Sequence, residues 1–390
     1  MAAQERALMR AAASQGASTP AAVRPSDRAR FTILSPSEIN AIEADWADLA
    51  ANAVEANPFF APWMLAPALR HLGGEKAKLV CLWDGPRLIG LLPVTRTVGY
   101  ARLPVAFLES WIYEHCFYGA PLMRRGSEKA FFEALFAFID AQAPFGGFLR
   151  LPLLDAKGPF TRGLNGAAGR RFHYIAGEFE RAILHGGYET QAFLAENMRN
   201  KKASEMRRRR KKLSEIGEVV FRKFSSGDDL DEWLESFVAL EGAGWKREAG
   251  TSFRANENQV EFLRETVRGA AASGDLQFFR LDVGGVAAAM MINFARDGQS
   301  YGFKICYDEA HSRYSPGVLM EIDLLSALEG MGASDFVDSC AAPDHPMINS
   351  LWPDRRRLVG VNIAAANPAA RAMLSFCKFL EDLSERMRKP

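Results

Sequence analysis

The chain has 390 residues, of which 48% are hydrophobic and 24% are charged; this composition is ordinary for a globular protein, and the length suffices for two domains. The formal net charge of +1 excludes a globally basic nucleic-acid-binding protein, although it leaves room for a local basic patch. Five cysteines lie far apart, without the spacing of a disulfide framework or a metal site, so we expect a reducing, cytoplasmic setting and no metal. No uninterrupted apolar run of about 18 residues occurs, so no membrane-spanning helix is expected.

The first half of the chain alternates short apolar runs with amphipathic segments. After an Ala-, Ser- and Arg-rich start without a continuous apolar segment, which favours a disordered tail over a secretory signal, a strand and two helical segments are expected. A β-hairpin over Leu79–Leu91 follows, then a helix over 128–141 and a strand over 148–151. This order is typical of an α/β unit.

The second half repeats the same order of elements. A strand at 219–221 is followed by amphipathic helices over 230–240 and 260–267 and by a hairpin over Phe278–Phe294. The repetition predicts two copies of one α/β (α+β) unit, each with a mixed, mostly antiparallel sheet flanked by helices. The expected parts are a disordered tail, two units and a C-terminal helix: 1–30, 31–185, 186–369 and 370–388.

A helix-start signal follows the third strand of the second half. The strand ends at Tyr307, and Ser315, Pro316 and Gly317 stand directly before an apolar helix over 318–328. Ser as N-cap with Pro at the first helical position is a common helix start. The first turn of such a helix offers backbone N–H groups that suit a phosphate; the simpler interpretation is a helix cap alone.

A basic stretch, Arg199–Lys212, lies between the two expected units. It includes the unbroken run from Arg207 to Lys212, and Glu205 is its only acidic residue. Such runs are usually solvated helix faces. The alternative is contact with an anion: a phosphorylated cofactor, tRNA or an acidic membrane surface. Both interpretations remain open.

Five further segments carry a resemblance to a known family: Leu240–Lys246, Phe303–Ala310, Tyr314–Leu319, Asp338–Ala341 and His345–Asn349. Together with the basic stretch they resemble the GNAT acyltransferases of the CelD-like group, which is linked to cellulose or exopolysaccharide biosynthesis. The resemblance covers roughly residues 190 to 360 and is looser over the first half.

The resemblance implies a tandem GNAT architecture, similar to the Fem-type peptidyl transferases that use aminoacyl-tRNA. The implied activity is transfer of an acyl group, acetyl in the first instance, from acyl-CoA to an amine or hydroxyl of a small-molecule or saccharide-related acceptor. In GNAT enzymes the CoA pyrophosphate lies on a Gly-rich loop that opens a helix. Ser315-Pro316-Gly317 has that place here but departs from the usual Gln/Arg-x-x-Gly-x-Gly/Ala pattern. Two alternatives stay open: aminoacyl transfer from tRNA, and a non-catalytic GNAT-like accessory protein of polysaccharide biosynthesis.

Acyl transfer to an amine requires a base, a stabilised oxyanion and a proton for the leaving thiolate. The candidate catalytic residues are Glu241, Tyr307, Asp308 and Asp338. The candidate CoA-binding residues are Lys304, Arg313, Ser315, Gly317, Val318 and Leu319. The candidate acceptor-binding residues are Trp245, Lys246 and His345. Each also has a structural interpretation; for Asp338, on an apolar strand, it is an ion pair.

Overall fold

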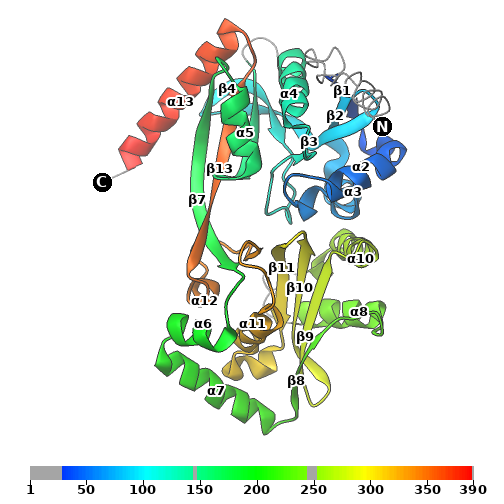
Figure 1. The fold of residues 1–390 in the computed structure, drawn as a ribbon, viewed down its shortest axis with the longest axis vertical. Helices are drawn as coiled ribbons and strands as arrows, with labels where there is room; N and C mark the ends of the chain where they lie inside the picture. Colours follow the sequence, from blue (N-terminus) through cyan, green and yellow to red (C-terminus); the bar gives the residue numbers. More distant parts are fainter. Residues whose placement is uncertain (1–28, 144–146, 244–252, 389–390) are drawn as a thin grey trace, which may run out of the picture.

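The computed structural model describes residues 29–143, 147–243 and 253–388. Its central feature is one thirteen-stranded sheet in the order β1-β2-β3-β4-β6-β13-β7-β12-β11-β10-β9-β8, with β5 paired to β3. Figure 1 shows helices on this sheet and two lobes, one above the other, that long strands connect. The expected α/β class with a mixed, mostly antiparallel sheet is therefore confirmed. The expected tail lies outside the described residues, except that Ala29 and Arg30 already belong to β1.

The upper lobe contains the first half of the chain together with its last strand and helix. Its elements are β1 (Ala29–Leu34), η1 (Pro36–Ile42), α2 (Glu43–Ala51), η2 (Pro58–Phe60), α3 (Pro62–His71), η3 (Gly74–Lys76), β2 (Lys78–Asp84), β3 (Arg87–Tyr100), β4 (Leu103–Ser110), β5 (Leu122–Met123), α4 (Glu128–Gln142), β6 (Phe148–Asp155), α5 (Pro159–Ala167), β13 (Asp354–Ala364) and α13 (Pro368–Arg388). None of the described helices, α13 included, is long and apolar enough to cross a membrane.

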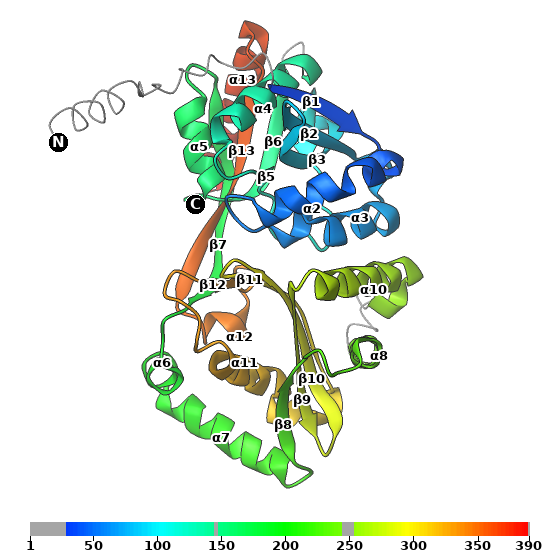
Figure 2. The ribbon, with the colours of Figure 1, turned by 45° about the vertical axis from the view of Figure 1, so that its right-hand side comes forward.

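The lower lobe follows the long connecting strand β7 (His173–His185). Its elements are α6 (Thr190–Asn197), α7 (Asn200–Ser214), β8 (Val219–Lys223), α8 (Leu230–Glu241), η4 (Phe253–Ala255), α10 (Glu257–Ala272), β9 (Leu276–Val283), β10 (Val286–Arg296), β11 (Gln299–Tyr307), η5 (Glu309–Tyr314), α11 (Pro316–Ala327), β12 (Phe336–Asp338) and α12 (Pro346–Asn349). Figure 2 shows α8 and α10 on one face of this part of the sheet, and α11 and α12 on the other.

Both lobes share one strand pattern. Strands β1 to β4 form an antiparallel meander, and after α4 the chain returns as β6, parallel to β4. Strands β8 to β11 form a second meander, and after α11 the chain returns as β12, parallel to β11. The predicted hairpins at Leu79–Leu91 and Phe278–Phe294 are confirmed as β2–β3 and β9–β10. The shared pattern supports a duplicated unit.

The two lobes are tied together by their long strands. β7 pairs with β13 in the upper lobe and with β12 in the lower lobe. β13 lies between β6 and β7, so residues 354–364, which the sequence assigns to the second unit, run from the junction of the lobes into the upper lobe (Figure 1). The reason is that β13 is apolar on both faces and is buried from Leu358 to Ala364, which requires a central place in a sheet. The domain boundaries proposed from sequence stay a prediction.

Candidate functional site

A gap between two parallel strands distinguishes the lower lobe. β11 and β12 pair only over Gln299–Tyr301 and Phe336–Asp338, whereas β11 continues to Tyr307. Its register with β10 shifts at this point, leaving Phe303 as an extra residue opposite Ile292 and Asn293. Such a bulge bends a strand and increases its twist, and bulges are frequent beside active sites. The bulge therefore marks where β11 departs from β12.

A cavity of about 80 Å³ lies in this gap. β10 and β11 supply Asn293 and Lys304 to its wall, α11 supplies Glu321, and Trp352 closes the wall from the segment after α12. The indole Nε1 of Trp352 is buried and has no hydrogen-bond partner within the described part of the chain. A buried N–H without a partner is uncommon in folded proteins, so this cavity offers a ligand an unused donor.

Glu321 is the most unusual group of the cavity. Its side chain is buried on the face of α11 that also carries Leu324 and Leu325. Burial raises the pKa of this carboxyl to about 8, and its Oε2 atom has no hydrogen-bond partner among the residues that the structure describes. A carboxyl with a pKa near the working pH in a cavity is typical of acid–base catalysis.

Glu321 should make stability depend on pH. The folded-state pKa of about 8 exceeds the ordinary value of 4.5, so the folded protein keeps a proton that the unfolded chain releases. This contribution is complete below pH 4.5 and is lost as the pH rises to 8. We expect Glu321→Gln to unfold at a higher temperature than the wild type at pH 8, with a smaller difference at pH 5. Thermal unfolding of both proteins at several pH values measures this; parallel curves would contradict the raised pKa.

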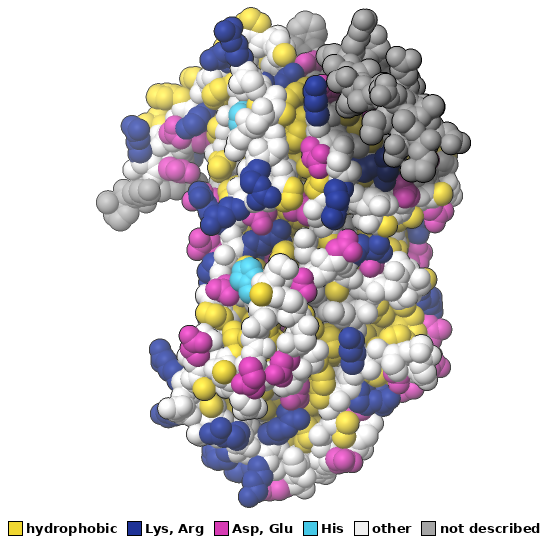
Figure 3. Space-filling view, viewed as in Figure 1, with side chains coloured by type: hydrophobic (Ala, Val, Ile, Leu, Met, Phe, Trp, Pro, Cys, Tyr) yellow, Lys and Arg dark blue, Asp and Glu magenta, His cyan; other side chains and the backbone are white. Residues whose placement is uncertain are grey.

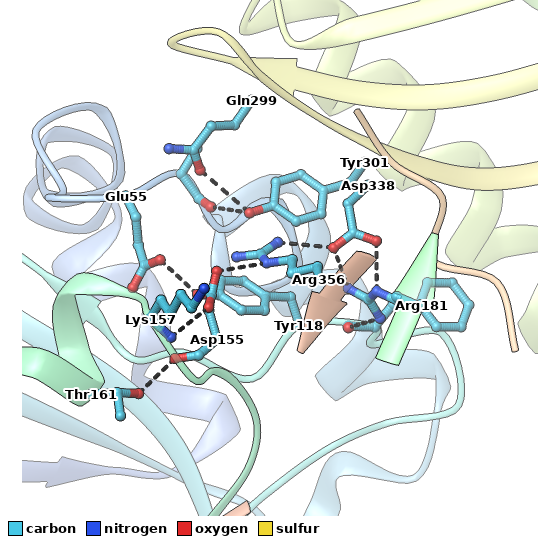
Figure 4. A network of polar contacts seen from close by, with 12 residues as sticks. Glu55, Tyr118, Asp155, Lys157, Thr161, Arg181, Gln299, Tyr301, Asp338 and Arg356 are labelled. Carbon is cyan, nitrogen blue, oxygen red and sulfur yellow. Dashed lines mark hydrogen bonds and ion pairs between the residues drawn. The ribbon is translucent and has the colours of Figure 1, made fainter. Parts of the chain in front are cut away.

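Asp338, a predicted catalytic residue, is held by two arginines. Its Oδ2 accepts hydrogen bonds from Arg181 at 2.7 Å and from Arg356 at 2.9 Å, and its Oδ1 accepts one from the Cys340 N–H at 2.9 Å (Figure 4). Burial alone would raise the pKa of Asp338, but the two guanidinium groups hold it below its usual range. An ionised carboxylate in such contacts is a poor base, so this geometry favours the ion-pair interpretation.

None of the four predicted catalytic residues is among the described residues that line the cavity. Glu241 is buried at the end of α8, where its Oε2 accepts a hydrogen bond from the Phe253 N–H at 3.0 Å. Tyr307 is exposed at the end of β11. Asp308 caps η5 by accepting a hydrogen bond from the Ala310 N–H at 2.9 Å. The structure therefore does not bring these predicted residues together.

The turn Ser315-Pro316-Gly317, which was predicted to bind a phosphate, offers fewer free backbone N–H groups than expected. Ser315 is the N-cap residue of α11, as expected, but it adopts a left-handed conformation with φ of 55° and its side chain makes no capping hydrogen bond. Its carbonyl accepts hydrogen bonds from the N–H groups of Val318 at 3.0 Å and Leu319 at 3.1 Å. The N–H groups of Val318 and Leu319, two of the three predicted phosphate donors, are therefore already engaged. Of the three, the prediction then depends on the Gly317 N–H.

Of the remaining predicted ligand-binding residues, the structure describes Lys304, Arg313 and His345. The Lys304 ammonium lies 5.3 Å from the centre of the Phe253 ring, and Arg313 lies 4.7 Å from the Tyr314 ring. His345 caps α12, where its Nδ1 accepts a hydrogen bond from the Ile348 N–H. Lys304 lines the cavity, whereas Trp245 and Lys246 lie outside the described residues.

The corresponding gap in the upper lobe is filled by the chain itself. β4 and β6 pair only at Leu108–Leu149 and Glu109–Arg150. Beyond these pairs the Gly119 N–H donates to the Leu153 carbonyl of β6 at 3.0 Å. A Cβ at Gly119 would lie 2.3 Å from the Pro152 carbonyl oxygen, so this close approach requires glycine. The loop between β4 and β5 thus occupies the place that is open in the lower lobe.

Comparisons with known proteins agree with this architecture. Residues 200–342 match the family model for the acetyltransferase (GNAT) domain, while no curated protein matches the chain. The fold is similar to that of FemX, at 9% identity and a TM-score of 0.51 over 87% of this chain and 98% of that chain. It is also similar to the C-terminal domain of a putative lysylphosphatidylglycerol synthetase from Agrobacterium fabrum, at 11% identity and a TM-score of 0.50 over 86% and 94% of the two chains.

A conserved protein of unknown function from Bacteroides thetaiotaomicron VPI-5482 is similar too, at 8% identity and a TM-score of 0.51 over 85% of this chain and 99% of that chain. At such identities the likeness concerns the fold, not the substrate. The chain is therefore built from GNAT-like units, and its second half carries the similarity to the GNAT acetyltransferase domain.

Proposed function

We propose that the lower lobe transfers an acyl group from a CoA thioester to an amine or hydroxyl of a small-molecule or saccharide-related acceptor. The observation that carries this proposal is the carboxyl of Glu321, which is buried, has an unpartnered oxygen and lies in the cavity between β11 and β12. The match of residues 200–342 to the GNAT domain supports acyl transfer as the reaction class.

Glu321 would act as the acid–base group of the reaction. The acceptor nitrogen or oxygen attacks the thioester carbonyl, a new bond forms to the carbonyl carbon, and the carbon–sulfur bond breaks. The Glu321 carboxylate takes the proton of the acceptor and returns it to the leaving thiolate. With a pKa of about 8 both protonation forms exist near neutral pH, which suits a group that takes and returns a proton. The indole N–H of Trp352 is available to the carbonyl oxygen as that oxygen gains charge.

The donor phosphates would lie at the start of α11. Gly317 stands in the first turn, where the N–H groups that begin a helix and the positive end of the helix dipole favour an anion, and the Arg209 guanidinium contacts the neighbouring Ser315 hydroxyl. Arg209 thus brings a positive charge of α7 to this turn. The basic helix and the phosphate turn, which are separate features in the sequence, are neighbours in the fold.

Gly317→Glu is expected to abolish binding of CoA, because it places bulk and negative charge where the phosphates approach. A Cβ at Gly317 would lie 3.6 Å from the Tyr307 ring, an ordinary contact, so Gly317→Ala is a suitable control that should bind CoA. Calorimetry with CoA and a melting curve for each variant measure the effect. Wild-type affinity for CoA in Gly317→Glu would show that the CoA phosphates do not bind at this turn.

A second candidate donor is aminoacyl-tRNA, which the exposed cations of α7 favour. Arg208, Lys211 and Lys212 are exposed, and Figure 3 shows Lys and Arg side chains gathered at the lower end of the molecule, where α7 lies. Arg210 is different, because it forms an ion pair of 2.7 Å with Asp323 of α11. A row of exposed cations suits a phosphate backbone.

Replacing Arg208, Lys211 and Lys212 with serine should lower affinity for tRNA and flatten its dependence on salt, since each lost phosphate contact reduces the slope of log affinity against log salt by roughly one. Arg209 and Arg210 stay unchanged because Arg209 contacts Ser315 and Arg210 contacts Asp323 of α11. Lys129→Ser, on the exposed surface of α4, is the control. Unchanged tRNA affinity at low salt would show that α7 is only a solvated face.

The choice of donor can be tested directly with acetyl-CoA, longer acyl-CoAs and charged tRNA. A ligand at 100 times its dissociation constant stabilises a protein by about 2.7 kcal/mol, which thermal unfolding detects. Ligand binding without turnover would favour the non-catalytic accessory protein. We further propose that the protein acts in the cytoplasm and serves cellulose or exopolysaccharide biosynthesis, the role that the sequence resemblance implies.

A further inference from the structure

The loop between β4 and β5 of the upper lobe reaches the lower lobe. Its residue His115 is only 4% exposed. The imidazole stacks on Phe262 of α10 with ring centres 5.4 Å apart, and it lies 5.0 Å from Phe253 and 5.9 Å from Phe303 of β11. His115 therefore adjoins the bulged stretch of β11 that lines the cavity.

Two hydrogen bonds determine which nitrogen of His115 carries the proton. The side-chain amide of Gln259 donates from Nε2 to the Glu114 carboxylate at 2.6 Å. Its Oε1 is therefore the atom that faces His115 Nε2 at 2.6 Å, and because an amide oxygen can only accept, His115 Nε2 must carry the proton. In a neutral ring this leaves the lone pair on Nδ1.

The Nδ1 atom of His115 has no hydrogen-bond partner in the described chain, although it is buried. The ring is neutral, because burial and, after it, the charge of Lys304 lower the pKa of His115 to about 4. A buried acceptor without a donor is costly in a folded protein unless a ligand completes it.

His115 and Glu321 approach the same stretch of β11 from different elements. The Phe303 ring, which contacts His115, and Lys304, whose charge acts on His115, also line the cavity that contains Glu321. Phe303 belongs to the core cluster of α8 and α10, whereas Ile305 packs with the cluster of α11. A ligand in the gap between β11 and β12 would thus meet groups from both faces.

We propose that His115 Nδ1 accepts a hydrogen bond from an N–H or O–H group of the acceptor bound between β11 and β12, so that the upper lobe supplies a substrate-binding residue to the lower lobe. This inference rests on the proposed acyl transfer. Nδ1 can only accept, so the acceptor must bring an N–H or O–H donor. The positive charge of Lys304 disfavours an ammonium ion, so the acceptor class is an uncharged amine or a hydroxyl compound.

The test uses hydroxylamine, a small acceptor that is largely uncharged at pH 7, with acetyl-CoA and longer acyl-CoAs as donors. His115→Gln keeps a polar group at the Nε2 position but no acceptor at Nδ1, and His115→Asn places an amide oxygen near Nδ1. We expect His115→Gln to raise KM for hydroxylamine about tenfold, which corresponds to the loss of one hydrogen bond. KM for the donor should not change, His115→Asn should recover most of the loss, and His173→Gln in the upper lobe is the control.

The outcomes separate this inference from the proposed function. A wild-type KM in His115→Gln, or an equal loss in both variants with lowered melting temperatures, would overturn the role of His115 while acyl transfer stands. If the wild type makes hydroxamate no faster than the uncatalysed reaction of hydroxylamine with each donor, the proposed function fails, and this inference fails with it. Nitrogen NMR of histidine-labelled protein at pH 7 gives a readout besides activity: a proton on Nδ1 of His115 would overturn the assigned acceptor.

Discussion

Glu321→Gln is expected to lower kcat by roughly 100- to 10,000-fold, the usual contribution of a general acid–base group. The amide keeps the shape of the carboxyl and removes the ionised form that takes a proton. The melting temperature should not fall, because the wild-type carboxyl is buried without a partner for Oε2. A loss of kcat without a loss of stability would assign the effect to the reaction.

The pH dependence of kcat/KM sharpens the same test. In the wild type the rate should rise with pH and level off near pH 8, where the Glu321 carboxyl ionises. Glu321→Asp should keep this dependence at a lower rate, since the carboxylate is retained but withdrawn from the cavity. Glu329→Gln is the matched control, because Glu329 is exposed and hydrogen-bonded to Thr190. Wild-type turnover in Glu321→Gln would remove Glu321 from the mechanism.

Much of the lower lobe could be predicted from sequence, because its signals are local. Alternation of apolar residues and the Gly turns predicted the β9–β10 hairpin, and Pro316 predicted the start of α11. Glu321 also had a local signal, because it lies three and four residues before Leu324 and Leu325 and therefore shares their apolar helix face, but the sequence reasoning missed it. An acidic residue on the buried face of a helix is a rare event that requires a partner or a function.

Other features depend on contacts between distant parts of the chain. Residues 358–364 are largely apolar, but the sequence analysis predicted no strand there, and it could not show that β13 enters between β6 and β7. It cannot show that the Ser315 carbonyl takes the N–H groups of Val318 and Leu319, because this depends on a single left-handed residue. It likewise cannot show that a loop of the upper lobe brings His115 to β11.

Asp338 is a further residue whose contacts with distant parts of the chain could not be predicted from sequence, and its substitution should have a large effect on stability. The sequence left pairing and function equally open, whereas in the structure the carboxylate joins Arg181 of β7 to Arg356 of β13. Arg356 also pairs with Asp155 at 2.9 Å and lies 4.3 Å from the Tyr118 ring. Figure 4 shows these side chains converging from both lobes. The cluster therefore connects the lobes where β7 and β13 pass between them.

Asp338→Asn is expected to lower the free energy of unfolding by about 3–5 kcal/mol, because removing one partner of a buried ion pair leaves uncompensated charge. Arg181 and Arg356 are 2% and 6% exposed, so neither guanidinium can turn to water, and only Arg356 retains another carboxylate. Glu178→Gln is the control: it removes a pair with Arg357 whose side chains are about half exposed, and such pairs contribute about 1 kcal/mol or less.

The pH dependence separates this ion pair from a loss of packing. Because the pKa of Asp338 in the folded protein lies below its ordinary value, its stabilisation is complete above the unfolded pKa and is lost as the pH falls through the folded one. The difference in unfolding free energy between wild type and Asp338→Asn should therefore be largest near neutral pH and shrink below about pH 4. Urea unfolding at pH 7, 5 and 3.5 measures this difference. A difference that stays constant with pH would mean that Asp338 stabilises the junction by shape and hydrogen bonding, and not by its charge.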